Sequence, residues 1–329
     1  MNVAVFIGRF QPFHNAHFEI VKHALAKHDR LIVGIGSANQ APSPKNPFSA
    51  VERIVMISDS LPREVKVDFI RLRDYLYNDN QWIVEVQRKV REEVLYGNRV
   101  TIVGRMKDRT SAYVRQFPQW ACDEYHDRHT QDATTVRKDM FECNWGAVRE
   151  AVPGPVYEQL VKWSHTDEFR WVQEERKHYI EYAKQFTSPF PVVHSTTSAV
   201  VIQSGHVLLI RRKASPGKGL YAIPGGFIGQ YETFEESMLR ELKEETGLLG
   251  NLKEHIVAHR MFDHPDRSLR TRTIDQSFCI RLPDGDLAEV NGGDDADKAF
   301  WLPLADLYSF EDRFFEDHLH IIRYFTSRF

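Results

Sequence analysis

The sequence predicts two domains of mixed helix and strand, an α/β domain followed by an α+β domain. The chain has 329 residues, which is more than one hydrophobic core usually organises. In the first half, short apolar runs alternate with amphipathic helical patterns, as is typical of a parallel sheet with helices on both faces. In the second half, strand-like runs flank one strongly amphipathic helix. A short segment with two prolines separates the two patterns.

The first half contains four apolar runs that we interpret as short buried strands. They cover residues 3–7, 31–36, 67–70 and 100–103, and helical patterns lie between them at 18–26, 51–59 and 81–95. The alternation fades after residue 136, and 156–185 has the charged, amphipathic pattern of one or two helices. The first domain is therefore expected to span residues 1–185.

A linker is expected at residues 186–195, because Pro189 and Pro191 interrupt the helical pattern there. Beyond it, strands are expected over four further runs, at 198–202, 206–211, 256–261 and 273–282. The second domain is expected to span residues 196–329.

The composition argues against several classes of protein. Apolar residues make up 42% and charged residues 27%, and the net charge of −3 gives no electrostatic reason to expect nucleic acid or a membrane surface as a partner. No apolar run approaches the roughly 18 residues of a membrane span. Three cysteines without a C-x-x-C spacing favour the reducing cytoplasm, and an N-terminus without a basic leader makes a signal peptide unexpected. Homo-oligomer formation stays open.

A predicted helix over 234–246 carries the strongest chemical signal. Apolar residues recur there at three- and four-residue spacing, and Gly247 is a typical helix stop. Glu241, Glu244 and Glu245 stand at i, i+3 and i+4, so their carboxylates crowd one face of the helix. Such oxygen ligands suit Mg²⁺ or Mn²⁺, which bind one or two carboxylates together with water and substrate phosphate. The alternative is a solvated acidic helix face.

Residues just before that helix extend the candidate metal site. Gly225 and Gly226 let the backbone come close to a metal ion or a substrate, and the carbonyl of Gly225 is a candidate ligand. Arg240 is placed to orient the carboxylates, and Glu232 is placed to brace the preceding turn. The predicted metal ligands are Gly225, Glu241, Glu244 and Glu245.

The segment from Gly226 to Leu248 fits the pattern G-x5-E-x7-R-E-U-x-E-E-x-G-U, with U aliphatic, at every fixed position. This pattern is the Nudix box, and the second domain resembles the Nudix hydrolases. The resemblance implies metal-dependent cleavage of nucleoside diphosphate derivatives, with Glu241 and Glu245 in catalytic roles. The box by itself does not select the substrate.

The loop after the expected strand at 256–261 gives information on which substrate is cleaved. It contains Arg270 and Arg272 and is similar to a loop of ADP-ribose pyrophosphatases, so these arginines would bind the diphosphate or the terminal ribose region. A plain polar hairpin loop is the alternative. The general base is expected outside the box, and the candidates are Glu289, Asp294, Asp295 and Asp297.

A second candidate site follows the first expected strand. Gly8, Arg9 and Phe10 open a turn that leads through His14 and His17 into a helix, and a strand, a turn and a helix N-terminus together form a phosphate site. The glycine patterns of dinucleotide-binding turns and of P-loops are both missing, so side chains would supply the phosphate ligands. Half of a zinc site, or two ordinary histidines, are the alternatives.

The stretch from Gly8 to His17 resembles the first motif of the nucleotidyltransferase superfamily, and more narrowly that of the archaeal-type nicotinamide-mononucleotide adenylyltransferases. Residues 34–38 followed by 46–53 are similar to the second signature of that family, and 74–82 and 133–137 are similar to two later signatures in the same order. The resemblance covers roughly residues 1–145. It implies a Rossmann-like domain with a parallel sheet in the first half.

That resemblance also implies roles for individual residues. The ATP phosphates would be bound by Arg9, His14, His17 and Arg137, with a hydroxyl from Thr134. A second set would contact the nucleotides, with Trp82 stacked on the nicotinamide ring: Gly8, Phe10, Arg53, Asn78 and Trp82. Alternatively, Trp82 belongs to the core face of a helix, and Arg53 pairs with Glu52 or Asp59.

Two positions depart from the family patterns. Ala16 stands where the first motif has glycine. A position that needs a positive φ would exclude alanine, whereas a position that needs only a small side chain would accept it. Asp132 adds a negative charge where the family often has serine.

The two halves together predict a bifunctional enzyme, an implication of the resemblance. The first domain would transfer an adenylyl group from ATP to nicotinamide mononucleotide, giving NAD and pyrophosphate. The second would split ADP-ribose into AMP and ribose 5-phosphate. The alternatives are a first domain that uses another acceptor or is inactive, and a second domain that only senses ADP-ribose.

Overall fold

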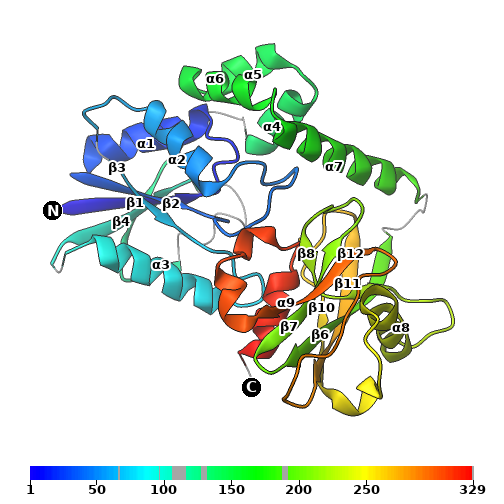
Figure 1. The fold of residues 1–329 in the computed structure, drawn as a ribbon. Helices are drawn as coiled ribbons and strands as arrows, with labels where there is room; N and C mark the ends of the chain where they lie inside the picture. The colour runs from blue at the N-terminus through cyan, green and yellow to red at the C-terminus, as the bar shows by residue number, and fades with distance from the viewer. Residues whose placement is uncertain (66, 96, 106–115, 127–131, 187–191, 328–329) are drawn as a thin grey trace. The chain divides into compact units, whose positions relative to one another are not determined.

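The computed structural model describes residues 1–65, 67–95, 97–105, 116–126, 132–186 and 192–327 (Figure 1). The chain divides into two compact units, residues 1–174 and 175–329.

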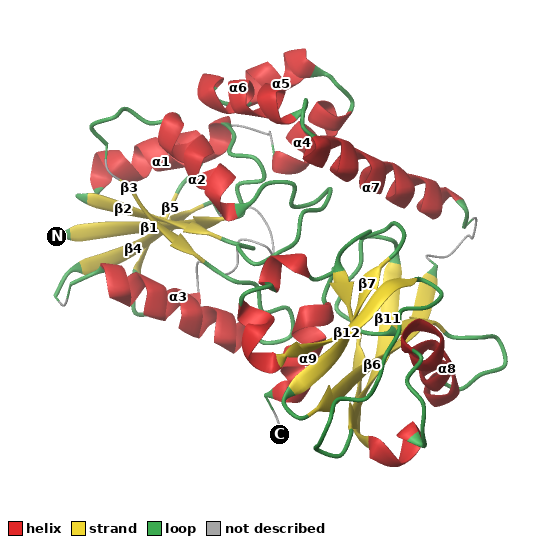
Figure 2. Cartoon of the chain, in the orientation of Figure 1, coloured by secondary structure: helices red, strands yellow, loops and turns green. Residues whose placement is uncertain are grey.

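The first unit alternates strands and helices, as the sequence predicts (Figure 2). Its elements are β1 (Asn2–Gly8), α1 (Asn15–Lys27), β2 (Arg30–Ile35), α2 (Ala50–Asp59), β3 (Val67–Arg71), α3 (Asp79–Glu93), β4 (Arg99–Gly104), β5 (Ala121–Glu124), α4 (Ala133–Phe141), α5 (Trp145–Ala151), α6 (Gly154–Trp163) and α7 (Asp167–Lys184), of which α7 runs on into the second unit.

The sheet of the first unit is parallel throughout, in the order β3-β2-β1-β4-β5. Side chains of β1 alternate between the two faces of the sheet, and each face has its own hydrophobic core. Ala4 and Phe6 pack with α1, α2 and α4 on one face, whereas Val3 and Val5 pack with α3 on the other. Strand order reverses between β1 and β4. In open α/β sheets, ligands bind beyond the carboxyl ends of the strands at such a reversal, so the turn after β1 lies where a nucleotide site is expected.

The second unit is built on a mixed seven-stranded sheet. Its elements are β6 (Val193–Gln203), β7 (His206–Arg212), β8 (Tyr221–Ala222), β9 (Gly225–Phe227), α8 (Phe234–Thr246), η2 (Leu252–His255), β10 (Ile256–Phe262), β11 (Arg272–Arg281), β12 (Ala296–Pro303), η3 (Leu304–Tyr308), η4 (Glu311–Arg313) and α9 (His318–Thr326). The α+β prediction is confirmed.

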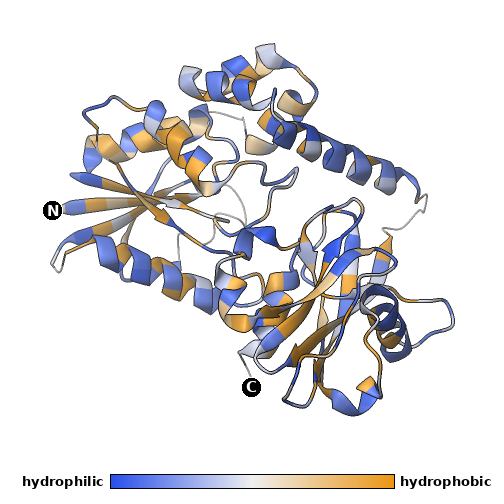
Figure 3. Cartoon of the chain, in the orientation of Figure 1, coloured by the Kyte–Doolittle hydropathy of each residue, from blue (hydrophilic) through white to orange (hydrophobic). Residues whose placement is uncertain are grey.

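The main path of that sheet is β10-β11-β6-β7-β12, with β9 on β6 and β8 on β7. Helix α8 packs Met238 and Leu242 against Ala199 and Val201 of β6, and its other faces are mostly hydrophilic (Figure 3). Helix α9 also contacts β6. Among the helices that the structure describes, none is long and apolar enough to cross a membrane.

The linker at 186–195 stays a prediction. Its residues 187–191 lie outside those the structure describes, and β6 already takes in residues 193–195.

Candidate active sites

The ring of Phe10 packs beneath the turn after β1 and shapes it. Phe10 has a φ of 52° and is 1% exposed. A Cβ on Gly8 would lie 2.8 Å from the Phe10 ring, so glycine is required for this close approach. Arg9, between them, is exposed. The structure therefore places Phe10 in the core below the turn and leaves Arg9 at the surface.

His14 and His17 stack on each other at the start of α1, with ring centroids 3.6 Å apart. The backbone N–H of His14 donates to Nδ1 of His17 at 3.4 Å, and the rings of Phe10 and Phe13 border His17. Burial, together with the neighbouring His14, lowers the pKa of His17 well below its usual value. His17 is therefore neutral at pH 7, and its Nε2–H is available as a donor.

Arg137 of α4 reaches the same turn. Its Nη1 donates to the carbonyl of Gln11 at 2.6 Å, and its Nη2 donates to Oγ1 of Thr134 at 3.3 Å. Burial, and then the charge of Arg9, lower the pKa of Arg137 to about 10. Two guanidinium groups that repel each other beside a strand-to-helix turn favour an anion between them.

Arg53 is fully buried and lies at the junction of three segments. It donates to four backbone carbonyls, those of Ser49 at 3.0 Å, Arg9 at 2.7 Å, Gly36 at 2.6 Å and Ser37 at 3.3 Å. Burial lowers its pKa to about 10. These bonds connect the turn after β1, the end of β2 and the start of α2. The structure shows Arg53 bonded to the backbone, and its predicted contact with the substrate stays a prediction.

Other expected substrate residues of the first unit occupy helix starts and faces. Asn78 is the N-cap of α3 and accepts from the Gln81 N–H at 3.1 Å. Trp82 lies partly buried on α3, with its ring 6.0 Å from that of Phe117. Thr134 is exposed at the start of α4. The nicotinamide-stacking role of Trp82 stays a prediction.

The two departures from the family patterns have simple structural explanations. Ala16 lies within α1 and is 6% exposed, and it is not among the residues with positive φ. Its position therefore needs a small side chain and not the conformational freedom of glycine. Asp132 is the N-cap of α4, where its carboxylate accepts from the Thr135 N–H at 2.9 Å.

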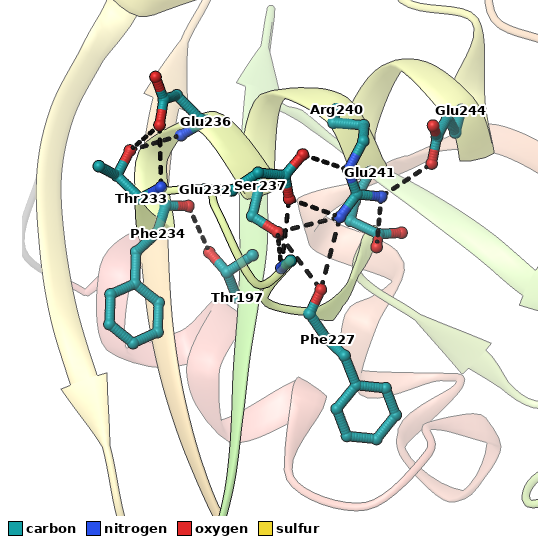
Figure 4. Close-up of polar contacts among 11 residues, drawn as sticks. Thr197, Phe227, Glu232, Thr233, Phe234, Glu236, Ser237, Arg240, Glu241 and Glu244 are labelled. Carbon is teal, nitrogen blue, oxygen red and sulfur yellow. Dashed lines mark hydrogen bonds and ion pairs between the residues drawn. The ribbon is translucent and has the colours of Figure 1, made fainter.

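In the second unit, α8 begins and ends at the predicted residues. Thr233 and Glu236 form a capping box, and Gly247 ends the helix in the left-handed conformation with a φ of 65°. Arg240 is the centre of an ion-pair network (Figure 4). It donates to Glu232 at 2.8 Å, to Glu241 at 2.8 Å and to Glu244 at 2.9 Å. The hydrogen bonds from Arg240 and Ser237 lower the pKa of Glu232 to about 2.

Glu245 and Glu241 point toward the backbone of β9. Glu245 is 3% exposed and accepts from the Gly225 N–H at 2.8 Å, while burial raises its pKa to about 8. A Cβ on Gly226 would lie 2.5 Å from Oε1 of Glu241, and burial raises the pKa of Glu241 as well. Buried carboxylates crowded in this way are stabilised as anions by a cation.

These carboxylates fit a metal that completes its coordination with water and phosphate. In the described part of the chain, no group of three or more His, Cys, Asp or Glu side chains is arranged so that it could hold a metal ion by itself. Mg²⁺ and Mn²⁺ do not need one, because they bind through one or two carboxylates and keep several waters. The network of Arg240 holds Glu241 and Glu244 beside Glu245 at this place.

A loop before β12 brings two of the candidate bases to the same end of α8. The Gly293 N–H donates to the carbonyl of Glu245 at 3.2 Å, and a Cβ on Gly293 would lie 2.4 Å from the Glu244 carbonyl oxygen. The charges of Asp294 and Asp295 act on Glu241 and Glu245, respectively. Of the other two candidates, Asp297 pairs with Arg211, and Glu289 is exposed.

A third arginine, Arg212, interacts electrostatically with the predicted Arg270, and the sequence did not single it out. Arg270 lies 3.7 Å from Glu316, and Nη1 of Arg272 is buried without a hydrogen-bond partner among the described residues. Arg212, at the end of β7, donates to the Pro216 carbonyl at 2.8 Å. Burial and the charge of Arg270 lower the pKa of Arg212, whereas Glu316 and Glu245 oppose that shift. No motif marked Arg212, because its place depends on the packing of distant segments.

This geometry defines a two-domain protein that joins a nucleotide-transfer fold to a diphosphate-hydrolase fold. Residues 5–154 match the cytidylyltransferase-like family, and residues 192–325 match the NUDIX domain family. A nicotinamide/nicotinic acid mononucleotide adenylyltransferase from Acinetobacter baylyi is 30% identical over 173 residues, which are 52% of this chain and 90% of that protein.

A solved structure extends the similarity to the whole chain. The bifunctional NMN adenylyltransferase/ADP-ribose pyrophosphatase of Francisella tularensis is 33% identical, with a TM-score of 0.93 and 99% of each chain covered. A second structure of that protein, with AMP and a manganese ion, is 32% identical, with a TM-score of 0.91 and 99% and 98% covered. The chain belongs to the family of bifunctional NMN adenylyltransferase/ADP-ribose pyrophosphatases.

Proposed function

We propose that the chain makes NAD in its first unit and cleaves ADP-ribose in its second. One observation carries the proposal: the same chain contains both features. The turn after β1, at the strand-order reversal of the first sheet, has positively charged side chains, and α8 has all three carboxylates of the candidate metal site. The substrates are ATP, nicotinamide mononucleotide and ADP-ribose. The alternatives, an inactive first domain or a sensing module, are not favoured.

In the first unit, the 5′-phosphate of the mononucleotide attacks the α-phosphorus of ATP, and pyrophosphate leaves. The chain's part is to hold two anions in line and to stabilise the charge that develops on the leaving group. Arg9 and Arg137 supply positive charge, and the neutral ring of His17 donates a hydrogen bond. Arg53 holds the segments that carry these groups.

In the second unit, water attacks the diphosphate of ADP-ribose and gives AMP and ribose 5-phosphate. The site uses a divalent metal ion, for which we propose Mg²⁺ or Mn²⁺ held by Glu241, Glu244, Glu245 and the Gly225 carbonyl. Such an ion stabilises the phosphate charge and lowers the pKa of bound water. Asp294 and Asp295 are our candidates for the general base, and Arg212, Arg270 and Arg272 for the diphosphate contacts.

A cytoplasmic location is part of the proposal. Within the described residues Cys122, Cys143 and Cys279 form no disulfide, and the first two are exposed, as in proteins of a reducing compartment. Whether copies of the chain associate is left open.

The test is one set of incubations of the full chain with Mg²⁺. ATP and nicotinamide mononucleotide should give NAD and pyrophosphate, and ADP-ribose should give AMP and ribose 5-phosphate, both detected by chromatography. Nicotinic acid mononucleotide, compared in the same assay, measures the acceptor preference. Protein that binds ADP-ribose without cleaving it would favour the sensing alternative, and protein that releases no NAD would remove the first half of the proposal.

A further inference from the structure

A group of aromatic rings lies beside the carboxylates of the second unit and has no part in the mechanism described so far. The ring of His194 lies 5.5 Å from that of Phe227 and 4.8 Å from that of Phe186. The Tyr182 hydroxyl and Nε2 of His194 lie 3.3 Å apart. Phe227 is 43% exposed, an unusual position for a large apolar ring next to a catalytic motif.

The strand β9 connects this ring group directly to the metal site. Its three residues are consecutive: Gly225 binds Glu245 through its N–H, Gly226 approaches Glu241, and Phe227 follows. Figure 4 shows the Phe227 carbonyl turned toward Arg240 and the ring turned away from it. The backbone of Phe227 therefore supports the metal site, while its side chain is free to serve another purpose.

An arginine covers the ring group from the side of the diphosphate site. The guanidinium carbon of Arg270 lies 5.5 Å from the centroid of the Phe227 ring. Glu316, at 3.7 Å, and the Ser268 hydroxyl, at 3.4 Å, hold Arg270 in place. Carboxylates, arginines and rings thus follow one another across one surface of the unit.

We propose that the purine base of the diphosphate substrate stacks on the ring of Phe227, which His194 holds in an edge-to-face contact with an interplanar angle of 70°. This inference rests on the proposed hydrolase function and adds to it the site of the nucleobase. A nucleoside diphosphate places a flat π-system a short distance from its phosphates, and exposed rings beside arginines are the surface on which such a base stacks. The adenosine half of ADP-ribose therefore lies over β9, and the ribose 5-phosphate half lies on the opposite side of the metal site.

The test uses Phe227→Leu, which removes the π-face and keeps the backbone carbonyl that supports Arg240. The KM for ADP-ribose should rise about tenfold, within the range that one base–aromatic stack contributes, while kcat changes little, because the stack is present in both ground and transition state. AMP, added as a competing product, should inhibit about tenfold more weakly. Inhibition by ribose 5-phosphate should be unchanged, since it has no base.

Two further variants make the test specific. Phe227→Tyr keeps the π-face and should restore the KM. Tyr231→Leu removes an aromatic ring that is 92% exposed in the loop before α8, and it should behave as the wild type does.

Other outcomes would show which of the two proposals is wrong, the base-stacking site or the hydrolase function. An unchanged KM in Phe227→Leu, or weaker inhibition by ribose 5-phosphate in place of AMP, overturns the base-stacking site and leaves the hydrolase function standing. Wild-type protein that does not cleave ADP-ribose overturns the function itself.

Discussion

Buried charged side chains have two different uses in this protein. Arg53 donates to four backbone carbonyls and acts as an internal connector. Glu245 is buried to a similar degree, but the Gly225 N–H is its one hydrogen-bond donor within the described residues. A buried group whose bonding capacity is filled stabilises the fold, whereas a buried carboxylate with remaining lone pairs is ready for a ligand.

Ala16 provides a residue-level test of the first site. Because it lies inside α1 with helical geometry, Ala16→Gly should lower the stability of the first unit by about 1 kcal/mol and should not accelerate NAD formation. Thermal unfolding and the initial rate of NAD synthesis check both statements. A faster variant would mean that the motif does need glycine at this position.

His318 should give the second unit a pH-dependent stability. Its Nδ1 accepts from the Ile223 N–H at 3.0 Å, and burial, followed by the charges of Arg267, Arg212 and Arg270, lowers its pKa well below the usual value. The unfolded chain then binds a proton, near pH 6.5, that the folded unit does not bind, so stability is lost as the pH falls below that point.

The variant His318→Gln keeps an acceptor for Ile223 and removes this titration. Between pH 7.5 and pH 5, the wild type should lose more stability than the variant does, as measured by urea unfolding at each pH. Parallel pH curves for the two proteins would contradict the assignment.

At the scale of elements, the sequence predicts features that local signals determine, and it misses those that depend on long-range contacts. Helix α8 was predicted to the residue from its apolar spacing and from Gly247, and the structure adds the Thr233 cap at its start. The short strands β5, β8 and β9 were not predicted, since two to four residues give no periodicity. The buried position of Arg53 depends on the carbonyls of Arg9, Gly36 and Ser37, which are distant in the sequence, so the sequence could not show it.

A buried ion pair positions the loop that carries Arg270. Arg267 donates to both carboxylate oxygens of Asp317 at 2.9 Å, and the two side chains are 4% and 1% exposed. The preceding residue, Glu316, accepts from the Ser268 hydroxyl at 2.7 Å and the Leu269 N–H at 3.2 Å. The segment before α9 therefore holds the arginine loop through consecutive carboxylates.

Asp317→Asn should destabilise the second unit by about 3 kcal/mol, because it removes the charged partner that accepts two hydrogen bonds from the buried Arg267 guanidinium. The looser loop should also raise the KM for ADP-ribose. Chemical unfolding and hydrolysis kinetics measure the two effects. Asp312→Asn, at an exposed aspartate in η4 of the same unit, is the matched control, and equal losses in both variants would contradict the special role of the pair.

At the scale of the whole molecule, each unit has its own sheet, its own core and its own candidate site. The residues that we assign to adenylyl transfer all lie before residue 175, and those that we assign to hydrolysis all follow it. We therefore expect the two activities to be separable by single substitutions.

Two variants test that separation in opposite directions. Glu245→Gln removes one negative charge from the metal site and should reduce ADP-ribose hydrolysis by about a hundredfold or more, while NAD formation keeps its wild-type rate. His17→Ala removes a phosphate donor and should reduce NAD formation by about a hundredfold, while hydrolysis is unchanged. Both rates are measured on the same preparation, with thermal unfolding as the check on folding. If either folded variant loses both activities, the model of two independent sites is wrong.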